Sequence, residues 1–323
     1  MKRFIGFLAL TLIWGGASAA LAAEKIKVRI GHFPNITHVQ ALVAHALSRQ
    51  GKGWFEARLG PTVEIQWFVY NAGPSAIEAI FANSIDVTYI GPNPALNAYV
   101  KSNGAEARIL SGAVNGGAAL VVQDDGRIKS PQDFKGRKIA TPQLGNTQDV
   151  AARAWLKRQG FKITQLGGDV LVVPSENADQ LSMFSQGNVD AVWTVEPWVS
   201  RLELQAKGKI FMEQKDTVTT VLLSSARFVK DRPELAQKLK EAHRELTGWI
   251  NANPQQAKAL VRLEMEAATR RAFPAELLER SWPRLQITNE VSRASLDQFV
   301  ADAVDAGFLK AKIDLDRLLT EVK

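Results

Sequence analysis

The sequence predicts an α/β fold in two lobes, because one unit of a short apolar helix, a buried strand and a proline turn occurs twice. The first copy has its helix at 74–81 and its strand at 86–90, and the second has them at 178–184 and 190–194. Each strand begins with aspartate and ends shortly before a proline. Open α/β sheets bind ligands beyond the carboxyl ends of their strands. Two such ends predict two lobes that face one cleft.

The N-terminus has the pattern of a cleaved secretory signal. Lys2 and Arg3 precede an apolar run at 4–14, and small residues with Ala-x-Ala options at 17–19 and 20–22 follow it. The apolar run is shorter than the roughly 20 residues that a membrane span needs. We therefore expect residues 1–23 to be a signal peptide and the mature protein to work in the periplasm.

The first lobe is expected to alternate strands and helices. Apolar and basic residues alternate at 25–30, which predicts a strand. Thr37 is a good N-cap residue for a helix whose apolar residues, from Val39 to Leu47, fall on one face. This alternation is typical of a mostly parallel sheet. The further elements expected here are a strand at 63–70, a helix opened by Pro74, the first repeated unit, a helix through Tyr99 and a strand at 107–112.

The second lobe is expected to begin near Gly116 and Gly117. A polar loop at 141–147 caps a helix at 149–159, which Gly160 ends. The lobe also includes strands at 118–122, at 170–173 and at 210–211, a turn and a strand within 133–140, and the second repeated unit. A strand at 218–223 returns the chain to the first lobe, and helices are expected at 233–251, 254–267, 274–281 and 292–306. The predicted lobes are 24–117 with 222–323, and 118–221, and their two linkers predict a hinge.

The composition excludes several classes of site and partner. The 323 residues contain no cysteine, which excludes a disulfide framework, a thiolate metal site, a cysteine nucleophile and a lipoprotein anchor. The formal net charge is +7, but the basic residues are scattered among acids, as at 262–270, so nucleic acid is not an expected partner. The length exceeds one ordinary core and fits two lobes in a chain that we expect to be monomeric.

Several segments resemble the solute-binding proteins of ABC importers. They are the signal peptide and the stretches 27–31, 86–94, 130–140 and 191–198. The chain is most similar to the branch that binds aliphatic sulfonates, taurine and nitrate. Sulfonate binders usually continue the first strand with a Gly-Tyr-Gln-like turn, whereas this chain has Gly-His-Phe-Pro-Asn at 31–35. The resemblance implies a type II periplasmic-binding fold with two α/β lobes joined by a two-strand hinge, a membrane permease and a cytoplasmic ATPase as partners, and a role in sulfur metabolism.

Two expected helix starts, at Thr37 and His38 and at Asn146 and Thr147, are candidates for holding an anion. The first N–H groups of a helix have no intrahelical partner and attract negative charge. One such start in each lobe can hold a sulfonate or a carboxylate without a bound metal. The alternative is plain N-capping, which uses the same residue types.

Four further candidates provide backbone access or polar groups. Gly73 and Gly145 let the backbone approach a ligand, or they are only turn glycines. Asn93 can donate and accept at the end of a buried strand, or it forms an Asx-turn. Asn35 lies in the loop before the first helix start.

A carboxylate and two aromatic residues complete the predicted site. Glu196 suits an ammonium group such as that of taurine, but a hinge or rim acid paired with Arg201 is an equal alternative. Phe33 and Trp198 either cover an alkyl chain or pack in the core of a lobe.

We expect no metal site, no cofactor and no catalytic residue. His38 and His45 would lie about two helical turns, roughly 10 Å, apart, which is too far for one ion at about 2 Å from each. His32 precedes the helix, and no acidic cluster accompanies it in the sequence. The sequence has no Walker-type loop and no Gly-x-Ser-x-Gly motif, so it supports neither nucleotide chemistry nor serine hydrolysis.

These patterns predict a non-enzymatic receptor for a small anionic organosulfur solute, an aliphatic sulfonate or taurine. The alternatives are another small solute, namely nitrate, bicarbonate or a pyrimidine or vitamin precursor, and an enzyme similar to the pyrimidine synthases of thiamine formation. The export signal favours the receptor, because such biosynthesis is cytosolic. Fold alone does not separate these functions.

Overall fold

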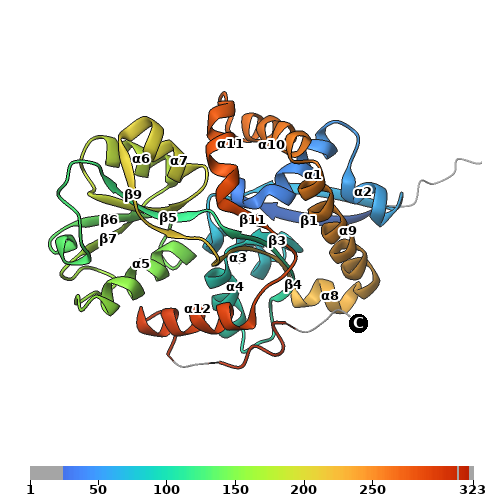
Figure 1. Cartoon of the computed structure of the whole chain (residues 1–323). Coiled ribbons are helices and arrows are strands. Elements are labelled where there is room, and N and C mark those ends of the chain that lie inside the picture. Colours follow the sequence, from blue (N-terminus) through green and yellow to red (C-terminus); the bar gives the residue numbers. More distant parts are fainter. Residues whose placement is uncertain (1–24, 311–312, 320–323) are drawn as a thin grey trace, which may run out of the picture.

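The computed structural model describes residues 25–310 and 313–319. The expected signal peptide at 1–23 lies outside these residues. Two α/β units, each built around its own sheet, lie side by side (Figure 1). The predicted α/β class with two lobes is confirmed by this arrangement.

The first sheet has six strands in the order β11-β4-β10-β3-β1-β2. β1 runs parallel to β2 and β3, but β10 is antiparallel to both β3 and β4. The sheet is therefore mixed rather than mostly parallel, because β10 enters it from the other unit. The short edge strand β11 was not expected from the sequence. The bounds are β1 (Ile26–His32), β2 (Val63–Val69), β3 (Val87–Ile90), β4 (Arg108–Gly116), β10 (Val218–Ser224) and β11 (Leu285–Ile287).

Helices cover both faces of this sheet, because its central strands are apolar on both sides. On β10, Leu222 packs in one hydrophobic cluster with α1, α2, α9 and α10, whereas Val221 and Leu223 pack in another with α3, α4 and α12. The bounds are η1 (Ile36–His38), α1 (Val39–Arg49), α2 (Trp54–Leu59), α3 (Gly73–Phe81), α4 (Pro92–Lys101), α8 (Ala226–Asp231), α9 (Pro233–Ala252), α10 (Pro254–Thr269), α11 (Ala275–Ser281), η3 (Trp282–Arg284) and α12 (Arg293–Asp305).

The start and the burial of α1 differ from the prediction. Thr37 lies inside η1, and neither η1 nor α1 has a side chain that caps its first turn. The expected N-cap at Thr37 is therefore wrong. Every residue from Val39 to Ala46 is buried, rather than one face alone, because α10 packs against α1 in addition to the sheet. Polar residues of α1 such as Gln40 and His45 therefore need partners inside the protein.

The second sheet has five strands in the order β7-β6-β8-β5-β9. Its faces are covered by α5 on one side and by α6 and α7 on the other. Asn146 caps α5 as expected, because its side chain accepts a hydrogen bond from the Asp149 N–H. The bounds are β5 (Ala118–Gln123), η2 (Pro131–Phe134), β6 (Lys138–Thr141), α5 (Thr147–Arg158), β7 (Leu171–Pro174), α6 (Asn177–Ser185), β8 (Ala191–Val195), α7 (Trp198–Ala206) and β9 (Gly208–Gln214).

The chain passes between the units at two adjacent places. It leaves the first sheet at Gly116 and Gly117, whose φ angles of 74° and 70° favour glycine. It returns between β9 and β10, where the Gly116 N–H donates to the Thr217 carbonyl over 2.9 Å. Residues 218–221, which the sequence assigns to the second lobe, already pair in the first sheet.

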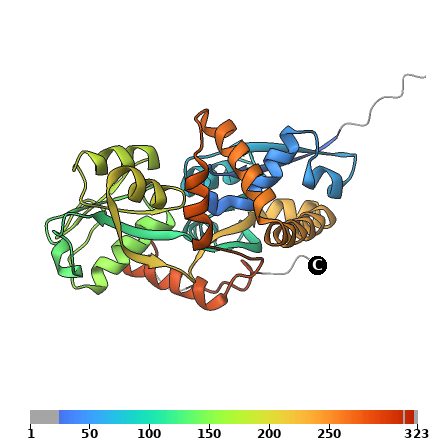
Figure 2. The same ribbon diagram turned by 45° about the horizontal axis from the view of Figure 1, so that its top comes forward.

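Two C-terminal helices also touch the second unit. α12 packs against both α4 and α5, and α11 packs against α7. Figures 1 and 2 show α11 and α12 beside the junction, on opposite sides of it. The units are therefore joined by side-chain contacts in addition to the two covalent crossings.

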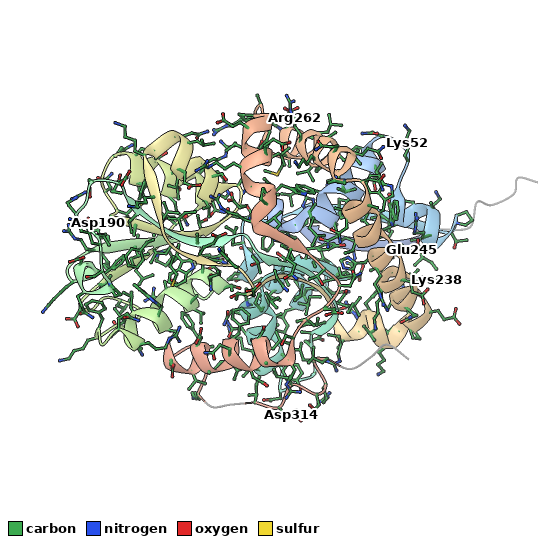
Figure 3. The ribbon with its side chains drawn as sticks, in the orientation of Figure 1. Lys52, Asp190, Lys238, Glu245, Arg262 and Asp314 are labelled. Carbon is green, nitrogen blue, oxygen red and sulfur yellow. The ribbon has the colours of Figure 1, made fainter. Side chains whose placement is uncertain are left out.

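Many charged side chains lie on the outside of the protein, as the scattered charge in the sequence predicts. Figure 3 shows Lys52, Lys238 and Arg262 at the periphery, and all three are exposed. Within the described ranges, no helix has both the length and the apolarity to cross a membrane.

Candidate functional site

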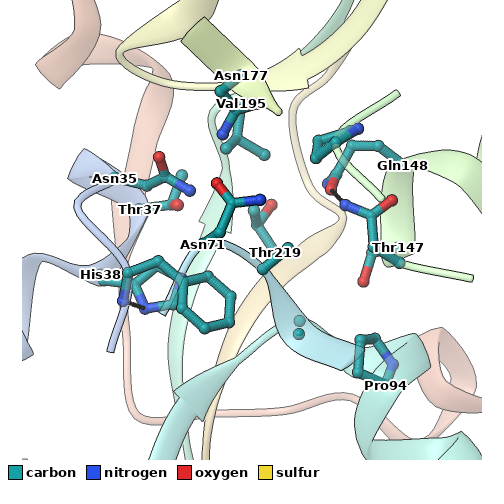
Figure 4. Close-up of a pocket in the computed structure, with 16 residues that line it drawn as sticks. Asn35, Thr37, His38, Asn71, Pro94, Thr147, Gln148, Asn177, Val195 and Thr219 are labelled. Atoms are coloured by element: carbon teal, nitrogen blue, oxygen red, sulfur yellow. Dashed lines mark hydrogen bonds between the residues drawn. The ribbon is translucent and has the colours of Figure 1, made fainter. Parts of the chain in front are cut away.

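A small cavity lies between the two α/β units, where the strands of both sheets end (Figure 4). Residues after β1, β2 and β3 and Thr219 of β10 form one wall, and residues after β6 and β7 and the last residue of β8, Val195, form the other. Its volume of about 30 Å³ is room for a few water-sized groups. The lining residues are Phe33, Asn35, Thr37, His38, Asn71, Ala72, Gly73, Gly91, Pro94, Pro142, Asn146, Thr147, Gln148, Asn177, Val195 and Thr219. This position is the one expected for ligands of open α/β sheets.

The cavity is polar but uncharged. Among the described residues that line it, none is a lysine, arginine, aspartate or glutamate. Burial keeps the pKa of His38 well below its usual 6.5, so this imidazole is neutral at pH 7. Its Nδ1 accepts from the Phe33 N–H over 3.4 Å, which leaves Nε2 as the donor. The lining therefore offers neutral amide, hydroxyl and imidazole groups.

The N-terminus of α5 is held firmly against this cavity. Thr147 and Gln148 occupy its first turn, whose N–H groups have no intrahelical partner. The Asp149 carboxylate behind them accepts from Thr141 Oγ1 over 2.9 Å and from the Gly145 N–H over 3.0 Å. Arg153 donates to the same carboxylate from Nε and Nη2, both over 3.1 Å. A buried ion pair thus fixes the loop before α5.

Hydrogen bonds beside the cavity hold the two units together. Trp198 Nε1 donates to Asn35 Oδ1 over 3.1 Å, and the Ile36 N–H donates to the Glu196 carbonyl over 3.1 Å. These contacts connect the loop after β1 with the start of α7. The structure is therefore in a closed arrangement in which little space remains between the units.

Seven of the predicted site residues line the cavity. The structure brings them together from segments that are far apart in the chain, as the two-lobe interpretation requires. They are Phe33, Asn35, Thr37, His38, Gly73, Asn146 and Thr147.

Three other predicted residues lie next to the cavity but do not line it. Asn93 is buried, and its amide nitrogen donates to the Phe299 carbonyl over 3.4 Å. Gly145 has a φ of 75°, so it serves the turn before α5. Trp198 reaches the site only through its hydrogen bond to Asn35.

Glu196 is fully buried away from the lining, and its carboxylate already has partners. Arg284 Nη1 donates to Oε1 over 2.6 Å, and Ser281 Oγ donates to Oε2 over 2.9 Å. The expected alternative partner, Arg201, instead lies over the Trp198 ring at 5.3 Å. Burial raises the pKa of Glu196, against the opposing effect of Arg284. This carboxylate therefore joins α11 and η3 to the second unit.

Several lining residues were not among the predictions. Asn71 follows β2 in the turn before α3, and Asn177 begins α6, the helix of the second repeated unit. Gln148 and Thr219 lie beside residues that were predicted for other reasons. Asparagine directly after a strand or before a repeated helix was the available signal for the first two.

Three buried side chains outside the cavity have the donor types of a metal site. His32, His45 and Glu264 place one ligand atom each within 4.8 Å of one another. Burial lowers the pKa of His32 to about 4. Burial raises the pKa of Glu264, but hydrogen bonds from His45 and Arg49 outweigh it, so that pKa is lowered overall. The sequence around His32 has no acidic cluster, and the single carboxylate comes from α10, which is distant in the chain.

Comparison with known sequences finds relatives that are named as binding proteins. A relative from Brucella abortus (strain 2308), named as a binding protein without a stated ligand, is 27% identical over 267 residues, which are 80% of this chain and 77% of that protein. A relative from Escherichia coli (strain K12), named for the binding of aliphatic sulfonates, is 28% identical over 214 residues, 65% of this chain and 62% of that protein.

Solved structures share the fold over nearly the whole chain. The alkanesulfonate-binding protein SsuA from Xanthomonas axonopodis pv. citri, bound to MOPS, has a TM-score of 0.69 at 22% identity, with 93% of this chain and 96% of that chain covered. The periplasmic nitrate-binding protein NrtA from Synechocystis PCC 6803 has a TM-score of 0.73 at 15% identity, with 90% and 84% covered. The predicted periplasmic-binding fold is confirmed. Residues 21–265 match the family model of the NMT1-like family, and the chain belongs to that family.

Proposed function

We propose that this protein is the solute-binding component of an ABC importer, that it works in the periplasm and that it catalyses no reaction. It captures a small anion with a sulfonate group and delivers it to a membrane permease with a cytoplasmic ATPase. The observation that carries the proposal is the uncharged, donor-rich cavity between the two units, with the start of α5 in its wall.

Neutral donors suit a sulfonate, because each of its three oxygens accepts hydrogen bonds. The first-turn N–H groups of α5 add the positive end of the helix dipole. Thr37 and His38 Nε2 supply donors from the opposite wall. A site of this kind holds an anion without a buried cation, whose desolvation would oppose binding.

The position of Glu196 favours the binding of an alkanesulfonate over the binding of taurine. The ammonium group of taurine needs a carboxylate, but Glu196 is buried in its contacts with Arg284 and Ser281. Among the described lining residues there is no other carboxylate. An ammonium group enclosed without an ionic partner costs about 1–3 kcal/mol or more. We therefore propose a sulfonate without an amino group as the preferred ligand.

The small volume of the cavity favours a second candidate. About 30 Å³ suits nitrate or bicarbonate better than an alkyl chain, and a two-carbon sulfonate needs the two units to stand slightly further apart. The amide side chains can also both donate to and accept from a neutral pyrimidine. These compounds are the competitors in the binding test.

Calorimetry on the mature protein tests the ligand class. Ethanesulfonate is expected to bind about tenfold or more tightly than taurine, because only taurine carries the unpaired ammonium group. Three or four charge-assisted hydrogen bonds, less the cost of ordering the ligand, reach the roughly 8 kcal/mol of a micromolar receptor. Nitrate, bicarbonate and a neutral pyrimidine are titrated in parallel. Binding of the pyrimidine alone would contradict the anion site, and preference for taurine would contradict the role given to Glu196.

We also propose that the two predicted lobes, 24–117 with 222–323 and 118–221, move against each other, except that residues 218–221 move with the first lobe because they pair in its sheet. The free protein is expected to be more open in solution than this closed structure. Solution scattering is therefore expected to show a smaller radius of gyration when ethanesulfonate saturates the protein. Gly91→Val is expected to prevent this change, because a Cβ at Gly91 clashes with Thr147 Oγ1 of the other unit. Gly248→Ala, where a Cβ meets nothing within 4 Å, is the matched control. Equal scattering with and without ligand in the wild type would contradict the hinge.

A further inference from the structure

Three elements of the first unit bring a buried polar cluster together. His32 ends β1, His45 lies in α1 and Glu264 lies in α10, and these elements lie side by side (Figure 1). His45 Nδ1 lies 3.0 Å from His32 Nε2 and 2.9 Å from Glu264 Oε1. All three residues are buried.

A hydrogen bond and a ring contact with residues outside this trio orient the two histidines. His32 Nδ1 lies 3.3 Å from the Phe33 carbonyl, a long hydrogen bond, and in this tautomer Nδ1 carries the proton and Nε2 has the lone pair. Metal-binding histidines usually donate their second ring nitrogen in this way. The His45 ring stacks on Trp67 with 5.0 Å between ring centroids and 11° between planes, which fixes its orientation.

Arg49 is the group that competes with a cation for Glu264. Its Nε donates to Oε2 over 2.7 Å, whereas its Nη2 lies 3.2 Å from Oε1. The second distance is at the long limit for an N–H···O bond. An ion on Oε1 therefore displaces the weaker of the two contacts and leaves the stronger one in place.

We propose that His32, His45 and Glu264 form a Zn²⁺ site that ties α10 to α1 and β1, with water as the fourth ligand. Zinc binds imidazole nitrogen and carboxylate oxygen at about 2.0–2.2 Å in tetrahedral geometry, which places ligand atoms roughly 3.3 Å apart. Two of the separations here are 3.0 and 2.9 Å, so these pairs move apart by a few tenths of an ångström. The third pair, the ligand atoms of His32 and Glu264, lies within 4.8 Å and adjusts to the same spacing. His45 Nδ1 lies close to both His32 Nε2 and Glu264 Oε1. The ion takes the position of a proton between these three atoms.

Zinc titration of untagged mature protein, after removal of metal with a chelator, tests the site. Calorimetry is expected to show one Zn²⁺ per chain, and Co²⁺ in its place is expected to give the visible absorption of a tetrahedral site. Saturating Zn²⁺ is expected to raise the melting temperature, because it binds only the native state. A wild-type protein that binds neither ion would overturn the proposal.

Substitutions then locate the ion. His45→Gln and Glu264→Gln are each expected to weaken Zn²⁺ binding by about 100-fold or more, since even the loss of a supporting partner costs 10–100-fold. His38→Gln is the matched control, because this histidine lies outside the trio, and its zinc affinity is expected to equal that of the wild type. Melting curves in chelator establish that each variant is folded. Unchanged zinc affinity in folded His45→Gln or Glu264→Gln would overturn the assignment.

Discussion

Arg153→Met is expected to lower the free energy of unfolding by about 3–5 kcal/mol, because it leaves the buried Asp149 carboxylate without its cation. The two side chains are only 1% and 0% exposed. Arg153 also donates to the carbonyls of Thr164 and Val172, at 2.6 and 3.4 Å, and both lose a donor. Urea unfolding followed by circular dichroism measures the change.

The same substitution at an exposed pair is the control. Arg262 and Glu266 are also four residues apart on a helix, but their side chains are 50% and 33% exposed. Arg262→Met is therefore expected to change stability by less than about 1 kcal/mol. Equal losses in the two variants would show that the ion pair of Arg153 does not brace the start of α5.

Thr147→Asp is expected to weaken ethanesulfonate binding by at least about 100-fold, because like charges brought together in a binding site cost several kcal/mol. The fold should tolerate the change, since a carboxylate in the first turn of a helix interacts favourably with the helix dipole. The Asn93 N–H, 3.4 Å from Thr147 Oγ1, remains a donor for the new side chain. Calorimetry with the folded variant gives the affinity.

Thr147→Asn separates charge from shape at this position. Asparagine has the size of aspartate but no charge, so this variant is expected to bind ethanesulfonate within about tenfold of the wild type, a difference of about 1.4 kcal/mol. Binding by Thr147→Asp that equals binding by Thr147→Asn would contradict an anion at the start of α5.

The features that local patterns determine were predictable from the sequence. The repeated unit predicted β3 and β8 and a cavity beyond their ends. A buried strand followed by a proline turn is a local pattern, so it can be recognised without knowledge of distant contacts. The Asn146 cap was predictable for the same reason. Thr37 failed as a cap because the chain makes a turn of 3-10 helix, η1, before α1 begins.

The predictions that were wrong concern contacts between segments that are distant in the chain. Glu196 pairs with Arg284, 88 residues away, rather than with its neighbour Arg201. Glu264 reaches Arg49 across 215 positions and brings a carboxylate to His32 and His45. The pairing of a buried charge is set by which elements pack together, and helical spacing carries no information about α10 lying on α1. The same packing buries the face of α1 that was expected to be polar.

A crystal structure of the mature protein with saturating ethanesulfonate shows directly where the ligand binds. We expect the sulfonate between the two units, with its oxygens accepting from the first-turn N–H groups at Thr147 and Gln148 and from side chains of the opposite wall. Glu196 is expected to keep its contact with Arg284 in that complex. A sulfonate bound elsewhere on the protein, or a cavity that holds only water at saturating ligand, would contradict a sulfonate site between the two units.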